Sequence, residues 1–305
     1  MIKKMGGWLM GLGLVIVLTG CGGQKSPVSS SSAVAKSADQ TTVISETAET
    51  TTNGAKENSI VKSSRPTVFI HGYSGGWGSF GGMISRLSGD GTGLNELSLT
   101  VDAAGTVTSK GKLSGEKTNP LIQVLFENNQ TTDENYATWI AACLAYLKQE
   151  YNINEVNLVG HSQGGVAVVK YLGEYSEDAQ QPKLTKAVVI AAPFNDFTDT
   201  AANQSLDDEI QQGPTVKNSR YTEIFEVGSQ FPVDLPLLVI AGQLSVEDLS
   251  DGTVPLTSAL AGIAPLRQAK VAVSYQVFTG KNAQHSLLHE NTAVDQAVTN
   301  FLWGK

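Results

Sequence analysis

Ser162 lies at the centre of the pentapeptide Gly160-His161-Ser162-Gln163-Gly164, which has the G-x-S-x-G pattern of an activated serine. An apolar run, 156–159, precedes it, and a segment of small residues with helical character, 165–172, follows it. A serine at a sharp turn between a strand and a helix adopts strained backbone angles, so the residues two places before and after it must be as small as glycine. The pattern therefore predicts a nucleophile elbow and acyl-transfer chemistry at Ser162.

A second match to the same pattern lies at Gly72–Gly76, with Ser74 at its centre. It also follows a strand-like run, 66–70, but it leads into further glycines rather than a firm helix. The overlapping G-x-G-x-x-G, 76–81, matches a dinucleotide-binding fingerprint, but five residues separate it from the strand and the helix after it is weak. We therefore favour Ser162 as the nucleophile and expect no cofactor.

Residues 65–305 have the length of one α/β domain in which strand-like and helical segments alternate. Such alternation implies a mostly parallel sheet with helices on both faces. Strand-like runs occupy 67–70, 121–126, 156–159, 187–191, 237–241 and 271–278, and helical patterns occupy 135–148, 165–175 and 292–302.

Two segments depart from this alternation. Residues 97–102 and 106–110 flank Ala103-Ala104-Gly105, which predicts an added β-hairpin at an edge of the sheet or lying over it. Residues 195–233 lie between two core strands and are polar with two short amphipathic pieces, which we interpret as a cap or lid over the site. The alternative is a surface insertion with no role in binding.

The chain resembles the α/β-hydrolase family, and more narrowly the lipoprotein-type cell-surface hydrolases of Gram-positive bacteria. The resemblance rests on His71-Gly72-Tyr73, Gly160–Gly165, Ser250–Pro255 and Gln284–Ser286, and it spans the whole predicted domain. It implies the α/β-hydrolase fold and serine chemistry, with a catalytic triad in the chain order Ser, acid, His. It says little about the substrate.

The acid of the triad is expected on a loop at the carboxyl end of a strand. Asp251 follows the run 237–241, in a turn that Gly252 can make and that Pro255, a good first helical residue, can end. Asp248 on the same loop is the alternative. A carboxylate at this position would hold an imidazole in the required tautomer and stabilise the imidazolium.

The base is expected to be His285, because it lies after the last predicted strand and before the final helix, where the α/β-hydrolase fold places its histidine. His289 is the alternative. The spacing of the two histidines could suggest a metal pair, but no glutamate lies between them, so we expect no metal. With His285 as the base, kcat/KM should fall below about pH 6 to 7, because an imidazolium cannot accept a proton.

An oxyanion hole needs backbone donors aimed at the developing negative charge. The residue after the nucleophile, Gln163, supplies one amide, and the loop after the first strand supplies the other, for which we choose Tyr73. The remaining histidines, His71 and His161, are interpreted as structural residues that orient loops.

The amino terminus predicts export. Residues 1–21 combine Lys3 and Lys4 with an apolar stretch and the lipobox Leu18-Thr19-Gly20-Cys21, so they resemble a bacterial lipoprotein signal with lipidation at Cys21. An ordinary secretory signal is the alternative, and both place the protein outside the cytoplasm. Residues 22–64 are rich in Ser and Thr and predict a disordered tether.

The net charge limits the classes of partner, and the cysteine content limits the disulfides. The formal net charge of −8 disfavours nucleic acid and anionic headgroups, so membrane contact is expected through the lipid alone. Cys143, in an apolar helical stretch, is expected to be an inert core residue that forms no disulfide.

The sequence thus predicts a membrane-tethered extracellular serine hydrolase, most simply a carboxylesterase or lipase-like enzyme that acts on small or medium acyl esters. Acyl transfer or amide cleavage on a cell-envelope component is the alternative within the same chemistry. A binding protein that has the fold without catalysis is the alternative from another class.

Overall fold

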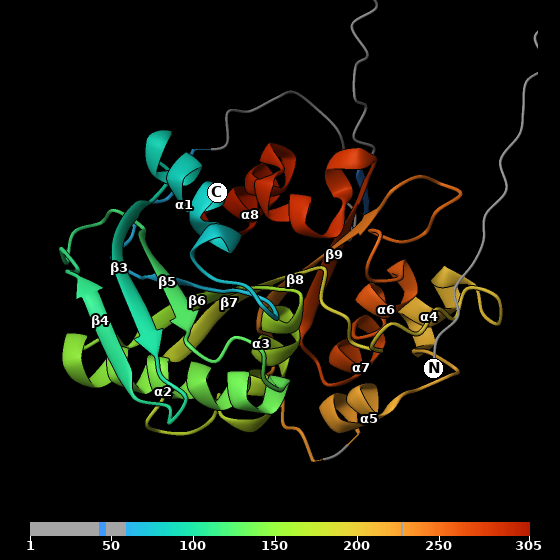
Figure 1. The fold of residues 1–305 in the computed structure, drawn as a ribbon, viewed down its shortest axis with the longest axis horizontal. Helices are drawn as coiled ribbons and strands as arrows, with labels where there is room; N and C mark the ends of the chain where they lie inside the picture. Colours follow the sequence, from blue (N-terminus) through green and yellow to red (C-terminus); the bar gives the residue numbers. More distant parts are fainter. Residues whose placement is uncertain (1–42, 47–58, 227) are drawn as a thin grey trace, which may run out of the picture. The chain divides into compact units, whose positions relative to one another are not determined.

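A computed structural model describes residues 43–46, 59–226 and 228–305 of the 305-residue chain. The described residues include one nine-stranded sheet in the order β1-β9-β8-β7-β6-β2-β5-β3-β4 (Figure 1). All neighbours from β9 through β3 pair in parallel, whereas β1 and β4 are antiparallel edge strands. The strands are β1 Val43–Glu46, β2 Thr67–Ile70, β3 Leu94–Val101, β4 Val107–Gly111, β5 Pro120–Phe126, β6 Glu155–His161, β7 Lys183–Ile190, β8 Pro236–Gln243 and β9 Ala272–Thr279.

Helices cover both faces of the sheet, as the alternating pattern predicted. Helices α1 and α8 lie on one face, and α2 and α3 lie on the other (Figure 1). The helices are α1 Trp77–Gly89, α2 Asp133–Tyr151, α3 Gln163–Glu174, α4 Leu206–Gln212, α5 Ser219–Phe225, α6 Leu256–Leu260, α7 Ile263–Gln268 and α8 Thr292–Trp303, with short 3₁₀ helices η1 Lys281–Ala283 and η2 His285–Glu290.

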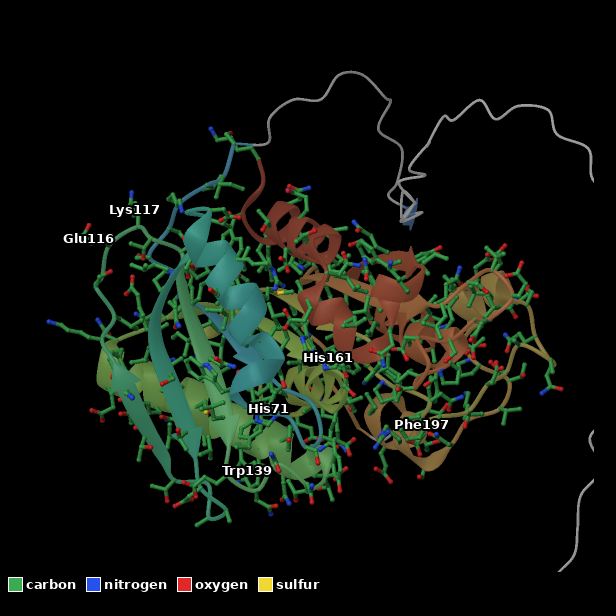
Figure 2. All side chains as sticks on the ribbon, turned by 45° about the horizontal axis from the view of Figure 1, so that its top comes forward. His71, Glu116, Lys117, Trp139, His161 and Phe197 are labelled. Atoms are coloured by element: carbon green, nitrogen blue, oxygen red, sulfur yellow. The ribbon has the colours of Figure 1, made fainter. Side chains whose placement is uncertain are left out.

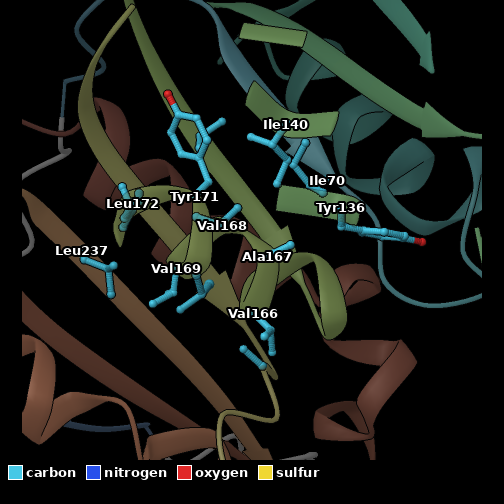
Figure 3. Packing of buried hydrophobic residues seen from close by; sticks show 14 of the residues in the cluster. Ile70, Tyr136, Ile140, Val166, Ala167, Val168, Val169, Tyr171, Leu172 and Leu237 are labelled. Carbon is cyan, nitrogen blue, oxygen red and sulfur yellow. The ribbon is translucent and has the colours of Figure 1, made fainter. Parts of the chain in front are cut away.

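Helix α3 is enclosed over most of its length. Its residues from Gln163 to Leu172 are all buried, because α3 packs against both the sheet and α2. Figure 3 shows its valines among Ile70 of β2, Leu237 of β8 and Tyr136 of α2. Small and β-branched side chains let the backbone of α3 approach the sheet closely. This packing fixes the start of α3, and therefore the residue that precedes it, Ser162.

The strands, helices and hairpin predicted within residues 65–305 agree with the structure except after Gly76. The six predicted strands and three predicted helices all form, with ends shifted by a few residues, and the hairpin forms as β3 and β4. The prediction of a weak helix after Gly76 is wrong, because α1 runs for 13 residues. Phe80, Met83, Ile84 and Leu87 form one buried face of α1, and this burial outweighs the low helix propensity of its glycines.

The described structure extends into the range that the sequence assigned to the tether. Strand β1 pairs with β9, and Val61 donates its amide to the carbonyl of Trp303 at 2.7 Å. The amide of Ser63 also donates to Asn119 Oδ1 at 2.7 Å. Main-chain pairing with β1 covers an edge of β9 that would otherwise be free. The predicted signal, Cys21 and most of the tether lie outside the described residues.

The predicted lid segment, residues 195–233, contains α4 and α5 and a described backbone on both sides of residue 227. Asn218 caps α5 by accepting from the amide of Tyr221 at 3.0 Å. None of the helices in the described part of the chain combines the length and apolar composition needed to cross a membrane.

Candidate active site

The predicted triad residues lie on three loops at the carboxyl ends of parallel strands. Ser162 follows β6, Asp251 follows β8 and His285 follows β9. Parallel strands end at the same edge of a sheet, and ligand sites of open α/β sheets form there. His285 is thereby brought into contact with Ser162, 123 positions away in the sequence, and with Asp251, 34 positions away.

Ser162 occupies a strained turn between β6 and α3. Its backbone angles are φ 54° and ψ −127°, an unfavourable region for a residue with a side chain. A Cβ at Gly160 would lie 2.5 Å from the carbonyl oxygen of Gly164, and a Cβ at Gly164 would lie 2.4 Å from that of His71. The requirement for glycine at both positions is confirmed. A hydrogen bond from the Ser162 amide to Ile190 O, 2.8 Å long, helps to maintain this backbone conformation.

Ser162, His285 and Asp251 form a continuous hydrogen-bonded chain. His285 Nε2 lies 2.9 Å from Ser162 Oγ, and His285 Nδ1 lies 2.7 Å from Asp251 Oδ2. With the Nδ1 proton donated to the carboxylate, Nε2 is left to accept the proton of the serine hydroxyl. Asp251 is 1 % exposed and His285 is 8 % exposed, so both interactions are shielded from solvent.

The loop around Asp251 orients its carboxylate. Asp251 Oδ1 accepts from the amides of Thr253 at 2.9 Å and Val254 at 2.7 Å, which leaves Oδ2 to face the imidazole. The backbone amide of His285 also donates to the Asp251 carbonyl at 2.9 Å. The alternative acid, Asp248, is exposed, and its amide donates to Ser245 Oγ. The structure thus brings Asp251, and not Asp248, to the histidine.

Ser74, the alternative nucleophile, also has a positive φ of 56° but lies in a different environment. Its hydroxyl accepts from Gln130 Nε2 at 2.7 Å on the exposed surface. Because the imidazole of His285 bonds to Ser162, it is Ser162 that has a base within reach.

The two amides predicted for the oxyanion hole lie on loops that meet at the elbow. A Cβ at Gly72 would be only 2.8 Å from Ser162 Cβ, so the His71–Tyr73 loop passes directly over the serine. Within the described structure, neither the amide of Tyr73 nor that of Gln163 has a hydrogen-bond partner. Free amides beside a nucleophile are suited to a developing oxyanion.

His71 orients the loop after β2. Its Nδ1 donates to Gly72 O at 2.8 Å, and its Nε2 accepts from the amide of Phe126 at 3.1 Å. Figure 2 marks the position of His71. Burial lowers the pKa of His71, so it stays neutral and keeps this pair of roles. The interpretation of His71 as a structural residue agrees with these contacts.

His161 connects the turn around Ser162 to the segment that carries His285. Its Nε2 donates to the carbonyl of His285 at 3.0 Å. Burial, and then the neighbouring His285 and His289, lower the pKa of His161 well below its ordinary value. A neutral His161 can make this contact without placing a charge beside His285. The other candidate base, His289, contacts Glu290 rather than Ser162.

A cavity of about 710 Å³ opens over Ser162 and His285. Tyr73, Pro193 and Phe197 give it apolar surface, and Phe197 belongs to the predicted lid segment. Five charged residues also line it, namely Asp133, Glu134, Asp196, Arg220 and Glu223. No pattern in the sequence indicates that these charged residues meet in one cavity. Thr132-Asp133-Glu134 signals only the capped start of a helix, which does not reveal the cavity that it faces.

Cys143 does not line this cavity. Cys143 is a free, buried thiol whose pKa is raised by burial, so its thiolate is disfavoured. Among the described residues, no group of three or more His, Cys, Asp or Glu side chains is arranged to hold a metal ion.

Comparison with known proteins identifies relatives of this fold. The family model DUF915, an alpha/beta hydrolase of unknown function, matches residues 54–305. The solved structure of the lin2722 gene product of Listeria innocua is 30 % identical, with a TM-score of 0.72, and the match covers 78 % of this chain and 93 % of that one. A candidate cell surface hydrolase from Lactobacillus plantarum WCFS1 is 23 % identical, with a TM-score of 0.62 and coverage of 77 % and 88 %.

A curated relative covers a smaller region. The abhydrolase domain-containing protein abhd-5.2 of Caenorhabditis elegans is 29 % identical over 192 residues, which are 63 % of this chain. The match spans 35 % of that protein, so the chain corresponds to about a third of its length.

Proposed function

Because this chain belongs to the DUF915 family of α/β-hydrolases, we propose that it is a serine hydrolase that cleaves acyl esters through an acyl-enzyme. The observation that carries the proposal is the hydrogen-bonded chain from Ser162 Oγ through the His285 imidazole to Asp251. Nucleophile, base and orienting acid within hydrogen-bond reach are the requirements of covalent acyl transfer.

In the first half of the reaction, Ser162 Oγ attacks the acyl carbon while His285 Nε2 takes the hydroxyl proton. Asp251 holds the resulting imidazolium, and the amides of Tyr73 and Gln163 stabilise the oxyanion. The intermediate collapses when His285 returns the proton to the departing alcohol oxygen and the ester C–O bond breaks. The acyl group is then joined to Ser162.

In the second half, His285 takes a proton from water, whose oxygen attacks the acyl-enzyme carbonyl. Collapse of this second intermediate breaks the bond to Ser162 Oγ, which regains its proton from His285, and the carboxylic acid leaves. The chemistry consumes one water per ester and needs no cofactor.

We place this reaction at the outer face of the cell membrane, with Cys21 as the lipid-modified anchor. The lipobox supports this location, and the Lactobacillus relative is likewise named for the cell surface. The cavity size and its charged lining favour small or medium soluble esters over lipid aggregates. A clear preference for emulsified long-chain triglyceride would contradict this choice of substrate.

The direct test is hydrolysis of p-nitrophenyl esters, from acetate to palmitate, by the purified full-length protein in detergent. We expect turnover of the short and medium esters, and we expect Ser162→Ala to lower kcat/KM by more than about 10³-fold. Ser74→Ala is the matched control and should leave kcat/KM within about 2-fold, since Ser74 has no base beside it. Equal activity of Ser162→Ala and the unmodified protein would overturn the proposal.

A further inference from the structure

The charged residues that line the cavity form one group, which we term the acidic wall. It consists of Asp133 and Glu134 at the start of α2, Asp196 after β7, and Arg220 and Glu223 on α5. The wall lies close to the nucleophile in the structure, because the side chain of Gln163 donates to Thr131 O at 2.8 Å. Thr131 directly precedes the cap of α2, so the elbow and the acidic wall are joined through Gln163.

The wall carries more negative than positive charge. Lys170, which is 4 % exposed and lies behind it, bonds to Glu134 and is 3.7 Å from Asp133 and 3.8 Å from Glu223. Arg220 Nη1 is 2.6 Å from Asp196. Four carboxylates therefore share two cations, which leaves a formal charge of −2.

Glu134 is held in the charged form at neutral pH. Burial raises the pKa of Glu134, but the hydrogen bond from Lys170 and its positive charge lower it further, to about 2. A negative charge at the edge of a cavity with low-dielectric walls acts over a longer range than the same charge in water.

Asp133 lies within ion-pair distance of both cations. It is 7 % exposed and lines the cavity, yet its Oδ2 has no hydrogen-bond partner among the described residues. The nearest cationic atoms are Lys170 Nζ at 3.7 Å and Arg220 Nε at 3.6 Å, beyond hydrogen-bond distance. Both cations also pair with other carboxylates, so they offset the negative charge of Asp133 only in part.

Resting on the proposed ester hydrolysis at Ser162, we propose that the acidic wall selects acyl esters that carry a positively charged ammonium group. Such a group would offset the excess negative charge while the ester carbonyl lies at Ser162. An anionic ester would be repelled by the same carboxylates. Asp133 and Glu223 are then specificity-determining residues for the cavity.

The test compares esters that differ only in charge. Butyrylcholine and 3,3-dimethylbutyl butyrate have the same shape, with a cationic nitrogen in place of a neutral carbon in the alcohol. The p-nitrophenyl esters of 4-(trimethylammonio)butanoate and 5,5-dimethylhexanoate make the same comparison in the acyl part. We expect kcat/KM to be at least about 10-fold higher for the charged member of one pair, and the pair that responds tells which part of the ester carries the ammonium group.

Two further measurements attribute the preference to the wall. Raising the salt concentration should reduce the charged-to-neutral ratio, because ions screen partly exposed charges. Glu223→Gln should lower the ratio several-fold, whereas the matched control Glu116→Gln should leave it unchanged. Glu116 is exposed and lies at the opposite side of the domain from Phe197 of the cavity (Figure 2).

The outcomes separate this inference from the function on which it rests. Hydrolysis of charged and neutral esters at equal kcat/KM, or a preference that neither salt nor Glu223→Gln reduces, would overturn the inference and leave ester hydrolysis standing. Failure to hydrolyse any of the esters would overturn both. The salt measurement uses the unaltered protein and does not depend on the folding of a variant.

Discussion

Ser162 keeps an unfavourable backbone conformation because close packing leaves no alternative. Its neighbours Gly160 and Gly164 approach other backbone atoms so closely that neither site has space for a Cβ. Neither glycine has a positive φ, so glycine is required at these two positions because the backbones approach closely. The hydroxyl of Ser162 is lifted to His285 by this arrangement.

Gly164→Ala tests the sterics of the elbow. Its Cβ would lie 2.4 Å from His71 O and 2.5 Å from Ile70 O, which are backbone atoms of the strand β2 and its loop. We expect a loss of about 1 to 3 kcal/mol in the free energy of unfolding, measured in urea, together with a large fall in esterase kcat/KM.

Gly78→Ala is the matched control, because a Cβ there meets nothing within 4 Å and Gly78 lies inside α1. This change should leave stability equal or raise it by up to about 1 kcal/mol, owing to the better helix propensity of alanine. Equal effects of the two substitutions would show that packing at the elbow is not tight.

The three residues of the proposed triad could be chosen from the sequence because their local patterns indicate where they lie in the fold. The pentapeptide around Ser162 encodes a turn, and the order of Asp251 and His285 along the chain follows the fold. Asp133 and Arg220 were not predictable in the same way. Their role in the cavity depends on how α2 and α5 meet in space, and no short pattern in the sequence reports that meeting.

In helix α1, the spacing of the apolar residues indicates the structure better than the glycine content does. Its glycines suggested a weak helix, yet Phe80, Met83, Ile84 and Leu87 have the i, i+3, i+4, i+7 spacing of a buried helical face. Tertiary packing against the sheet then determines the structure. A Cβ at Gly82 would meet the Glu290 carboxylate at 2.2 Å, so the absence of a side chain also lets α1 approach η2, which carries His285.

Helix α5 connects the lid segment to the rest of the domain through ion pairs. Arg220 and Glu223 of α5 face Asp133 of α2 and Lys170 of α3. The sequence predicted a polar lid with two short helical pieces but gave no partners for these charges. Long-range ion pairs of this kind have no local signature, because each charged residue reads as part of a solvated surface.

At the scale of the whole molecule, buried histidines should link stability to pH. Burial lowers the pKa of His71, His161 and His289 from the ordinary value of 6.5. The unfolded chain binds more protons than the folded one below about pH 6.5, so the free energy of unfolding should decrease as the pH falls from about 7 to 5. Each histidine that stays neutral contributes up to about 1.4 kcal/mol per pH unit.

Urea unfolding at pH 7.5, 6.5 and 5.5 measures this dependence. The variant His289→Gln removes one of the three groups and should give a shallower decrease. Burial raises the pKa of Glu209 and Asp295, which acts in the opposite direction, so the difference between variant and unmodified protein is the decisive quantity. Identical pH profiles for the two proteins would contradict the linkage through His289.

The central claim is that Ser162 is an activated nucleophile. It is tested most directly by reacting the full-length protein with a fluorophosphonate and mapping the modified peptide by mass spectrometry. We expect modification at Ser162 that is lost in Ser162→Ala, because only a hydroxyl whose proton passes to His285 should displace fluoride at a useful rate. Modification at Ser74, or no modification of the folded protein, would contradict the claim.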